Sequence, residues 1–255
     1  MNKLYSKISS DKQILTFHKI SDSFELSITR VPITRFRRLI SFIKQIGMRG
    51  IKLSGLETDN GVGLTFDDGW ADFHENAFPV LREQSFTATV FLVTDFIGRS
   101  SSWDYKRSRH LSWDQIEELA KAGVEFGSHS AGHRDLRPLT DSQLEHEILD
   151  SKKLIEDKLG VGVNYFSYPF GRFNKRVIEY VEKAGFKNAF TGPGGGFKFA
   201  ESRLGVYLYD TPYSLCLRLM KHSRIEKGKD YVNSALAGGT IILRKLRPVK
   251  SRRVS

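Results

Sequence analysis

Two adjacent carboxylates, Asp67 and Asp68, stand at the end of an apolar run and directly before Gly69. Neighbouring side chains of a regular strand point to opposite faces, but a glycine turn that begins there can bring both into one pocket. Two carboxylates so close together resist joint ionisation unless a cation lies between them. Taken alone, an Asp-Asp-Gly sequence is more typical of a solvated turn.

A second pair of side chains favours a catalytic interpretation instead. His129 and His133 lie four residues apart, just after a strand-like segment at 124–126. On a helical turn this spacing places both imidazoles on one face, where they can share a metal ion. Two neutral histidines and one aspartate form a three-ligand site with an open position for water, as in catalytic zinc sites. A metal lowers the pKa of that water toward ~7, and the second aspartate can act as base on it, as in a hydrolase.

Two further segments with candidate residues also lie at the ends of predicted strands. The sequence Ser-Tyr-Pro-Phe-Gly at 167–171 follows another strand-like run. Such a turn can direct a backbone N–H toward a developing oxyanion, although its ordinary interpretation is a simple turn. His18 directly follows the first predicted strand, at 14–17. A lone histidine there is more often packed than catalytic. Like the other segments, however, it stands at the carboxyl end of a predicted strand.

The elements that position these residues alternate along the chain. Short apolar, β-branched or aromatic runs are each followed by a charged amphipathic stretch, which predicts about seven βα units around a parallel sheet or barrel. Ser112 is a predicted N-cap, and Thr140 with Gln143 forms a capping-box pattern. The predicted strands are 14–17, 62–66, 88–93, 124–126, 165–168 and 188–191, and the predicted helices are 33–47, 72–84, 112–122, 140–159, 175–184 and 214–221. Barrels keep their sites at the carboxyl ends of the strands, which is where the chemical residues fall.

The composition favours one large domain. The chain has 255 residues, of which 40% are apolar and 27% charged, so it can fill a single core and is not disordered. The single cysteine, Cys216, excludes an intramolecular disulfide and a thiolate-rich zinc site, and it agrees with a reducing compartment. A metal must therefore bind histidine and carboxylate. The glycine-rich stretch 192–196 lacks the lysine of a phosphate-binding loop and is predicted to be an ordinary loop.

Three motifs in this order resemble those of the polysaccharide deacetylase family, the chitooligosaccharide-deacetylase-like carbohydrate esterases. They are Thr-Phe-Asp-Asp-Gly at 65–69, His-Ser-Ala-Gly-His at 129–133 and Tyr-Pro-Phe-Gly at 168–171. The resemblance implies an α/β fold, a distorted (β/α)7-type barrel in a single domain. It also implies metal-dependent hydrolysis of N-acetyl or O-acetyl groups of a glycan or glycan precursor, in polysaccharide or cell-envelope biosynthesis. We expect an N-terminal extension at 1–11, the barrel at 12–210, and a basic C-terminal helix and tail at 211–255.

The resemblance also implies roles for individual residues. Asp67 matches the family's catalytic base, and Asp68 matches its metal-ligating carboxylate. His129 and His133 match the two metal-ligating histidines. Phe170 stands at the aromatic position whose backbone N–H helps to hold the oxyanion. The ligand types favour zinc, although cobalt, nickel and iron also suit two histidines and a carboxylate.

The chain departs from the family pattern at two places. Ser167 stands where the family carries an arginine that orients the base, and Arg172 and Arg203 are the nearest candidates to replace it. The family's late Leu-x-His motif, which supplies the general acid, is missing, because 242–244 reads Ile-Leu-Arg. A subgroup similar to the poly-N-acetylglucosamine deacetylases carries this histidine on the first strand. The sequence Leu-Thr-Phe-His at 15–18 resembles that arrangement, so His18 is the expected acid.

The net charge of the chain bears on which partners it can bind. Forty Lys and Arg against 29 Asp and Glu give a net charge of +11, which attracts polyanions. No nucleic-acid module is recognisable, so we expect no nucleic-acid partner. The segment 215–221 and the basic tail from Arg244 predict peripheral contact with an anionic membrane, where a lipid-linked glycan would be found. The lack of a long apolar run and of a secretory signal predicts a cytoplasmic protein.

A different class of function remains open, a catalytically inactive glycan-binding or membrane-associated barrel. Ser167 and the missing late histidine favour it, whereas the retained ligands and base favour an enzyme. Exposed aromatic side chains near the strand ends can stack on sugar rings or pack as a lid, and the candidates are Trp70, Trp103, Tyr105 and Trp113. The sequence leaves the sugar and the oligomeric state open.

Overall fold

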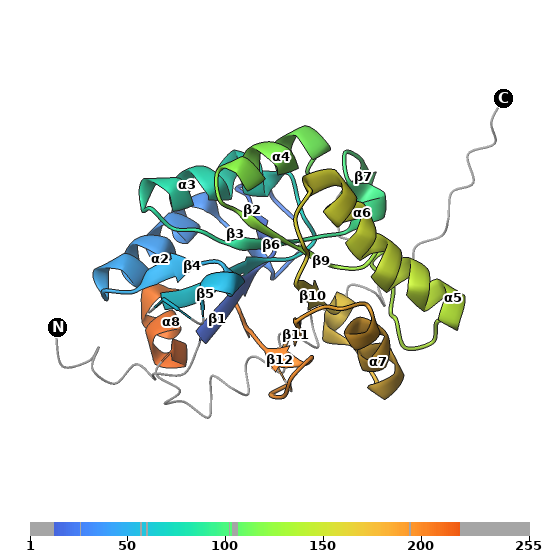
Figure 1. Ribbon diagram of the computed structural model, residues 1–255. Coiled ribbons are helices and arrows are strands. Elements are labelled where there is room, and N and C mark those ends of the chain that lie inside the picture. The colour runs from blue at the N-terminus through green and yellow to red at the C-terminus, as the bar shows by residue number, and fades with distance from the viewer. Residues whose placement is uncertain are drawn as a thin grey trace.

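The computed structural model describes residues 13–219, except 26, 57, 60, 102, 104–106 and 194. In this part of the chain a curved parallel sheet is surrounded by helices on its outer side (Figure 1). Hydrogen bonds join the strands in the order β12-β11-β10-β9-β6-β5-β1-β13, and β4 also pairs with β5. The two strands at the ends of this order, β12 (Glu201–Ser202) and β13 (Leu204–Gly205), are separated by a single residue. The sheet is therefore nearly closed, which confirms the predicted single-domain barrel.

The long predicted strands are present at the expected places. Nearly all of their residues are buried, polar ones included, as expected for strands of a parallel barrel covered on both faces. They are β1 (Gln13–Phe17), β5 (Gly61–Phe66), β6 (Thr89–Leu92), β9 (Glu125–Ser128), β10 (Tyr165–Ser167) and β11 (Asn188–Thr191). Shorter strands were missed because two or three residues carry no periodicity. These are β2 (Lys19–Ile20), β3 (Arg30–Val31), β4 (Arg49–Ile51), β7 (Ser100–Ser101), β8 (Ser108–Arg109), β12 and β13.

The predicted helices are also present, and two are interrupted. The helices are α2 (Ile33–Gln45), α3 (Phe78–Glu83), α4 (Trp113–Lys121), α5 (Asp141–Leu144), α6 (Ser151–Leu159), α7 (Lys175–Lys183) and α8 (Pro212–Leu219). Ser112 and Thr140 cap α4 and α5 through complete capping boxes, as predicted. Wider π-helical turns at Phe73–Ala77 and Glu145–Asp150 precede α3 and join α5 to α6. The single helices predicted at 72–84 and 140–159 are thus not uniformly α-helical.

A cluster of phenylalanines supports the ends of β1 and β5. The ring of Phe17 lies 5.2 Å from that of Phe66 and 5.2 Å from that of Phe36 on α2, and Phe66 lies 4.7 Å from Phe73. All four side chains are buried. Aromatic pairs of this kind contribute roughly 0.5–1.5 kcal/mol each beyond the area they bury. The cluster therefore makes a firm base beneath the residues that follow the two strands.

Helix α8 packs into the protein. Its residues Leu215 and Leu219 are fully buried and belong to the main apolar core, beside α2. The side chains of Leu215 and Leu219 therefore pack inward, whereas Leu217 is partly exposed. Peripheral membrane contact through 215–221 stays a prediction. Lys221, the tail from Arg244 and the extension at 1–11 lie outside the described residues. Among the described helices, none is both long and apolar enough to span a membrane.

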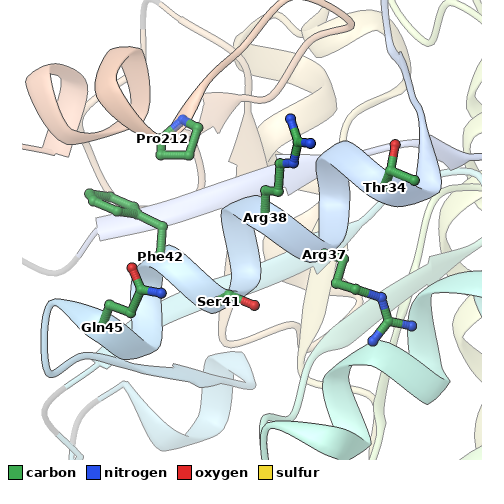
Figure 2. A pocket seen from close by; sticks show the side chains of 7 residues that line it. All are labelled: Thr34, Arg37, Arg38, Ser41, Phe42, Gln45 and Pro212. Carbon is green, nitrogen blue, oxygen red and sulfur yellow. The ribbon is translucent and has the colours of Figure 1, made fainter.

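A hollow lies on the outside of the barrel, between α2 and the start of α8 (Figure 2). Arg37 on its rim reaches toward α3, where it pairs with Glu83. The lining residues are Thr34, Arg37, Arg38, Ser41, Phe42, Gln45 and Pro212. They belong to α2 and α8, whereas the predicted site residues stand at the carboxyl ends of the strands.

Candidate active site

The segments singled out in the sequence meet at the carboxyl edge of the sheet. β1 and β5 pair in register, with Phe17 opposite Phe66, so His18 and Asp67 follow on neighbouring strands. The Asp67 N–H donates to the carbonyl of Phe17 at 2.9 Å, which extends the pairing into the site. His129 follows β9, and residue 167 ends β10. Four stretches far apart in sequence thus stand at one rim.

Asp68, His129 and His133 form a compact group of metal-ligand types. Asp68 Oδ1 lies 3.5 Å from His129 Nε2 and 3.3 Å from His133 Nε2, and each side chain is less than a tenth exposed. One ligand atom from each residue lies within 4.8 Å of the others. Two imidazole nitrogens and one carboxylate oxygen are a donor set that suits a divalent transition metal with an open position. The group therefore fits the metal that the sequence predicts.

The two histidines do not lie on a helical turn, contrary to expectation. Residues 129–133 form an irregular loop in which Ser130 and His133 adopt positive φ values of 67° and 54°. Such backbone conformations cost roughly 1–3 kcal/mol for a residue other than glycine and persist where the surroundings enforce them. Glu147, which is buried, accepts a hydrogen bond from the Gly132 N–H at 2.8 Å and so supports the loop. The spacing brings the imidazoles together through loop geometry.

The hydrogen bonding of His129 and the lowered pKa of His133 both favour metal binding. His129 Nδ1 donates to the carbonyl of Ser167 at 2.7 Å, so Nε2, which faces Asp68, is the nitrogen that can ligate a metal. Burial, followed by the nearby charges of His129 and His18, holds the pKa of His133 well below its usual range. A neutral imidazole is the form that ligates a metal.

A tryptophan next to the motif orients Asp68. Trp70 Nε1 donates to Asp68 Oδ2 at 3.0 Å, so the other carboxylate oxygen faces the histidines. The Lys19 ammonium lies 4.5 Å from the Trp70 ring, and His110 packs on it at 4.3 Å. His110 Nδ1 donates to the Asp68 carbonyl at 2.9 Å, and burial lowers the pKa of His110 to about 4. Sequence reasoning missed these supporting roles, since a tryptophan or a lone histidine carries no motif signal.

Asp67 is held by a different kind of partner. Arg203 donates from Nη1 to Oδ1 at 2.8 Å and from Nη2 to Oδ2 at 2.7 Å, and Ser167 Oγ donates to Oδ2 at 3.2 Å. Burial raises the pKa of the Asp67 carboxyl, but the Arg203 guanidinium and the imidazoles of His129 and His18 lower it more. The net effect places this pKa below its usual range. Asp67 is therefore ionised at neutral pH.

The structure distinguishes the two arginines that the sequence left open. Arg203 lies between β12 and β13, where the barrel closes, and its side chain is 3% exposed. Arg172 instead pairs with Asp135 at 3.3 Å and is 39% exposed. Ser167 donates to Asp67 and accepts from Arg203 Nη2 at 2.8 Å. The serine in the place of the expected arginine thus belongs to the same network as the arginine that contacts Asp67.

His18 and Phe170 also reach this rim. His18 Nδ1 is buried without a hydrogen-bond partner in the described part of the chain, and its ring lies near enough to Asp67 and His133 to influence the pKa of each. Phe170 adopts a left-handed backbone conformation, φ 60°. Its ring meets that of His133 edge-on at 4.5 Å. Both residues therefore lie beside the proposed ligands.

The aromatic side chains suggested for sugar contact differ in exposure and in position. Trp70 is only 2% exposed and cannot stack on a sugar. Trp113 begins α4, where the Lys158 ammonium lies 5.8 Å from its ring. Trp103 is partly exposed and stacks on His133. Tyr105 lies outside the described residues.

Comparison with known proteins shows to which family the chain belongs. A sequence profile of the polysaccharide deacetylase family matches residues 55–189, more than half of the chain. The chain belongs to the polysaccharide deacetylase family. The predicted family is confirmed, and that family includes hydrolases of carbon–nitrogen bonds other than peptide bonds. The matched segment includes Asp67, Asp68, His129, His133 and Phe170, whereas His18 and Arg203 lie beyond it.

Individual family members are similar over most of the chain. A putative polysaccharide deacetylase of Bacillus subtilis, YxkH, is 31% identical over 191 residues, which are 71% of this chain and 64% of that protein. The poly-β-1,6-N-acetyl-D-glucosamine N-deacetylase of Staphylococcus epidermidis is 27% identical over 202 residues, which are 75% of this chain and 67% of that protein. The chain therefore spans about two thirds of the length of these relatives.

Solved structures of the family share the fold. The Streptococcus pyogenes deacetylase PplD, in complex with acetate, superimposes with a TM-score of 0.72 at 23% identity, covering 82% of this chain and 97% of that one. IcaB from Ammonifex degensii gives a TM-score of 0.71 at 20% identity, covering 83% and 98%. These matches support the deacetylase barrel as the architecture of the chain.

Proposed function

We propose that this protein is a metal-dependent deacetylase that hydrolyses N-acetyl groups of a glycan, in polysaccharide or cell-envelope biosynthesis. The observation that carries the proposal is the placement of an ionised, arginine-paired Asp67 beside the Asp68, His129 and His133 group. The S. epidermidis relative, named for its action on a polymer of N-acetylglucosamine, supports an N-acetylated glycan as substrate. O-acetylated glycans are a second substrate class for the same chemistry. The cytoplasmic location stays a prediction from the sequence.

Asp68, His129 and His133 would hold a divalent metal, with zinc favoured by the ligand types. Such an ion, when bound, lowers the pKa of water and polarises the acetyl carbonyl. Trp70 keeps one oxygen of Asp68 occupied, so that the other stays directed toward the histidines. The carbonyl of Ser167 keeps His129 in the tautomer that offers Nε2.

The remaining residues handle the protons and the developing charge. Asp67 accepts a proton from the water that attacks the acetyl carbon, and Arg203 keeps Asp67 ionised for this role. The backbone N–H of Phe170 donates to the oxyanion that forms on the former carbonyl oxygen. His18 donates a proton to the nitrogen of the leaving sugar as the carbon–nitrogen bond breaks. The products are acetate and a free amino sugar.

The direct test is acetate release from a panel of N-acetylated and O-acetylated glycans, run beside elemental analysis of the protein. We expect release from an N-acetylated glycan, loss of activity with a chelator, and recovery when zinc is restored. Asp67→Asn serves as the inactive control. Binding of glycans without acetate release by the zinc-loaded wild type would overturn the proposal and favour the alternative, a catalytically inactive glycan-binding barrel.

A further inference from the structure

The two histidines of the proposed metal site are held in different ways. His129 Nδ1 donates to the Ser167 carbonyl at 2.7 Å, which fixes the rotation of its ring. His133 Nδ1 is buried and lacks a hydrogen-bond partner among the residues that the structure describes. Metal-ligating histidines usually orient their rings through a hydrogen bond from the second nitrogen. Another contact must therefore fix the ring of His133.

That contact comes from aromatic rings. Trp103 stacks on His133 with 4.8 Å between the ring centroids and 18° between the planes. Phe170 meets the same imidazole edge-on, at 4.5 Å and 64°. Stacked and edge-on ring pairs stabilise each other beyond the effect of the area they bury. A near-parallel stack also resists tilting of the imidazole out of its plane.

Trp103 itself is surrounded by rings. Phe96 meets it edge-on at 4.6 Å, and the rings of His110 and Trp70 lie at 4.8 Å and 5.5 Å. These neighbours belong to the structure that supports Asp68, since Trp70 donates to its carboxylate and His110 to its carbonyl. The rings that contact Trp103 therefore include the two that orient Asp68, the third proposed ligand.

The two short strands that flank Trp103 are tied to the barrel. β7 and β8 pair antiparallel on either side of it in sequence. Ser101 Oγ donates to His110 Nε2 at 2.8 Å, beside β7. The Lys19 ammonium donates to Ser108 Oγ at 3.0 Å, and it also pairs with Glu25 at 2.9 Å. The Lys19 contact joins β8 to β2, and the Ser101 contact joins β7 to the residue that follows β8.

We propose that Trp103 is a positioning residue for the metal site. Its indole fixes the His133 ring so that Nε2 faces Asp68 Oδ1 at 3.3 Å, in place of the hydrogen bond that performs this task for His129. The backbone of His133 is in a strained left-handed conformation, so the packing of its side chain helps to hold the loop as well. This inference rests on the proposed metal-dependent function.

The test compares three variants of the full chain: Trp103→Leu, Trp103→Phe and the control Trp113→Leu. Trp113 is also a partly buried indole packed against the core, on α4. The measurements are zinc affinity by competition with a chromophoric chelator, the visible absorption spectrum of the cobalt-loaded protein, and thermal unfolding without metal. We expect Trp103→Leu to weaken zinc binding by roughly 10–100-fold, the usual effect of losing a residue that orients a ligand.

The other outcomes separate positioning from general stabilisation and from sugar binding. Trp103→Phe retains a ring against His133, so it should preserve most of the affinity and the cobalt spectrum. Trp113→Leu should leave both unchanged even where it lowers the melting temperature. For Trp103→Leu, excess zinc should restore most of kcat.

Two results would overturn the inference in distinguishable ways. Wild-type zinc affinity and cobalt spectrum in Trp103→Leu would refute the positioning role and leave the proposed function intact. The same conclusion would follow if the variant showed only a raised KM for glycan at wild-type metal affinity, because Trp103 would then act as a sugar platform. Failure of the wild-type chain to bind zinc or cobalt would instead refute the proposed function together with this inference.

Discussion

Asp67 and Asp68 are neighbours in sequence, yet their surroundings differ completely. Asp67 accepts two hydrogen bonds from the guanidinium of Arg203. Asp68 accepts one from the neutral indole of Trp70 and presents its other oxygen to two imidazoles. A guanidinium keeps a carboxylate charged and competes with a metal, whereas imidazoles offer further lone pairs to a metal. These different contacts are the basis for proposing that one aspartate is the base and the other a metal ligand.

The backbone explains how two adjacent residues reach different partners. β5 ends at Phe66, and Asp68 and Gly69 both adopt left-handed conformations, with φ of 70° and 64°. This breaks the strand geometry between the two aspartates. Asp67 remains in line with the strand and faces Arg203, while Asp68 turns toward the loop that follows β9. Non-glycine residues rarely adopt such φ values, and here a proposed metal ligand does.

The largest effect is expected on the metal side. Asp68→Asn and His129→Ala should each lose tightly bound zinc and all measurable acetate release, because each removes one of three proposed ligands. Asp72→Asn is the matched control. Asp72 lies outside the proposed ligand group, and its Oδ2 accepts a hydrogen bond from the Ile20 N–H at 3.1 Å, which an amide oxygen can also accept. Elemental analysis of the dialysed proteins provides the measurement, and full zinc occupancy in Asp68→Asn would contradict the ligand assignment.

The next effect concerns the base. Asp67→Asn should lower kcat by about 10²–10⁴-fold, the contribution of a general base, while zinc stays bound. It should also destabilise the protein by roughly 3–5 kcal/mol, since Arg203 is left buried without a counter-charge. Activity, zinc content and denaturant unfolding are measured on one preparation. Loss of zinc along with activity would show that the two aspartates do not have separate roles.

A smaller effect is a shift in pH dependence. Burial alone would raise the pKa of Asp67, and Arg203 reverses this. Arg203→Met should therefore raise that pKa, so the base is protonated at higher pH and the acid limb of kcat/KM moves upward. Arg203→Lys retains a charge and should shift the limb less. Profiles are recorded with saturating zinc, and an acid limb that stays in place in Arg203→Met would contradict the tuning role.

The smallest effect is expected from the support of Asp68. Trp70→Phe keeps a ring in the aromatic cluster but removes the N–H that occupies Oδ2. Zinc affinity should fall about tenfold, at the lower end for loss of a hydrogen bond to a ligand. The pH profile should stay that of the wild type, because Asp67 is untouched. A shifted pH profile with unchanged zinc affinity would contradict the account, because Trp70 would then act on Asp67 rather than on Asp68.

Local features of the fold were predictable because local sequence determines them. The capping boxes at Ser112 and Thr140, the apolar strands and the Asp-Asp-Gly turn need only neighbouring residues. The loop that carries His129 and His133 was wrongly expected to be helical, because a His-x-x-x-His spacing does not reveal that Ser130 and His133 are left-handed.

Long-range partners were not predictable in the same way. Arg203 reaches Asp67 only because β12 and β13 close the barrel, and these strands are too short to leave a periodic signal. The sequence therefore left Arg172 and Arg203 as equal candidates. The stack of Trp103 on His133 likewise depends on β7 and β8, two short strands with no pattern of their own.

The most direct test of the division between the two aspartates is anomalous diffraction from crystals of the zinc-loaded wild type. We predict one peak within ~2.0–2.2 Å of Asp68, His129 and His133, the range for zinc on nitrogen and oxygen ligands. Asp67 should remain paired with Arg203 and outside the coordination sphere. A peak that Asp67 ligates, or a peak away from both histidines, would contradict the account.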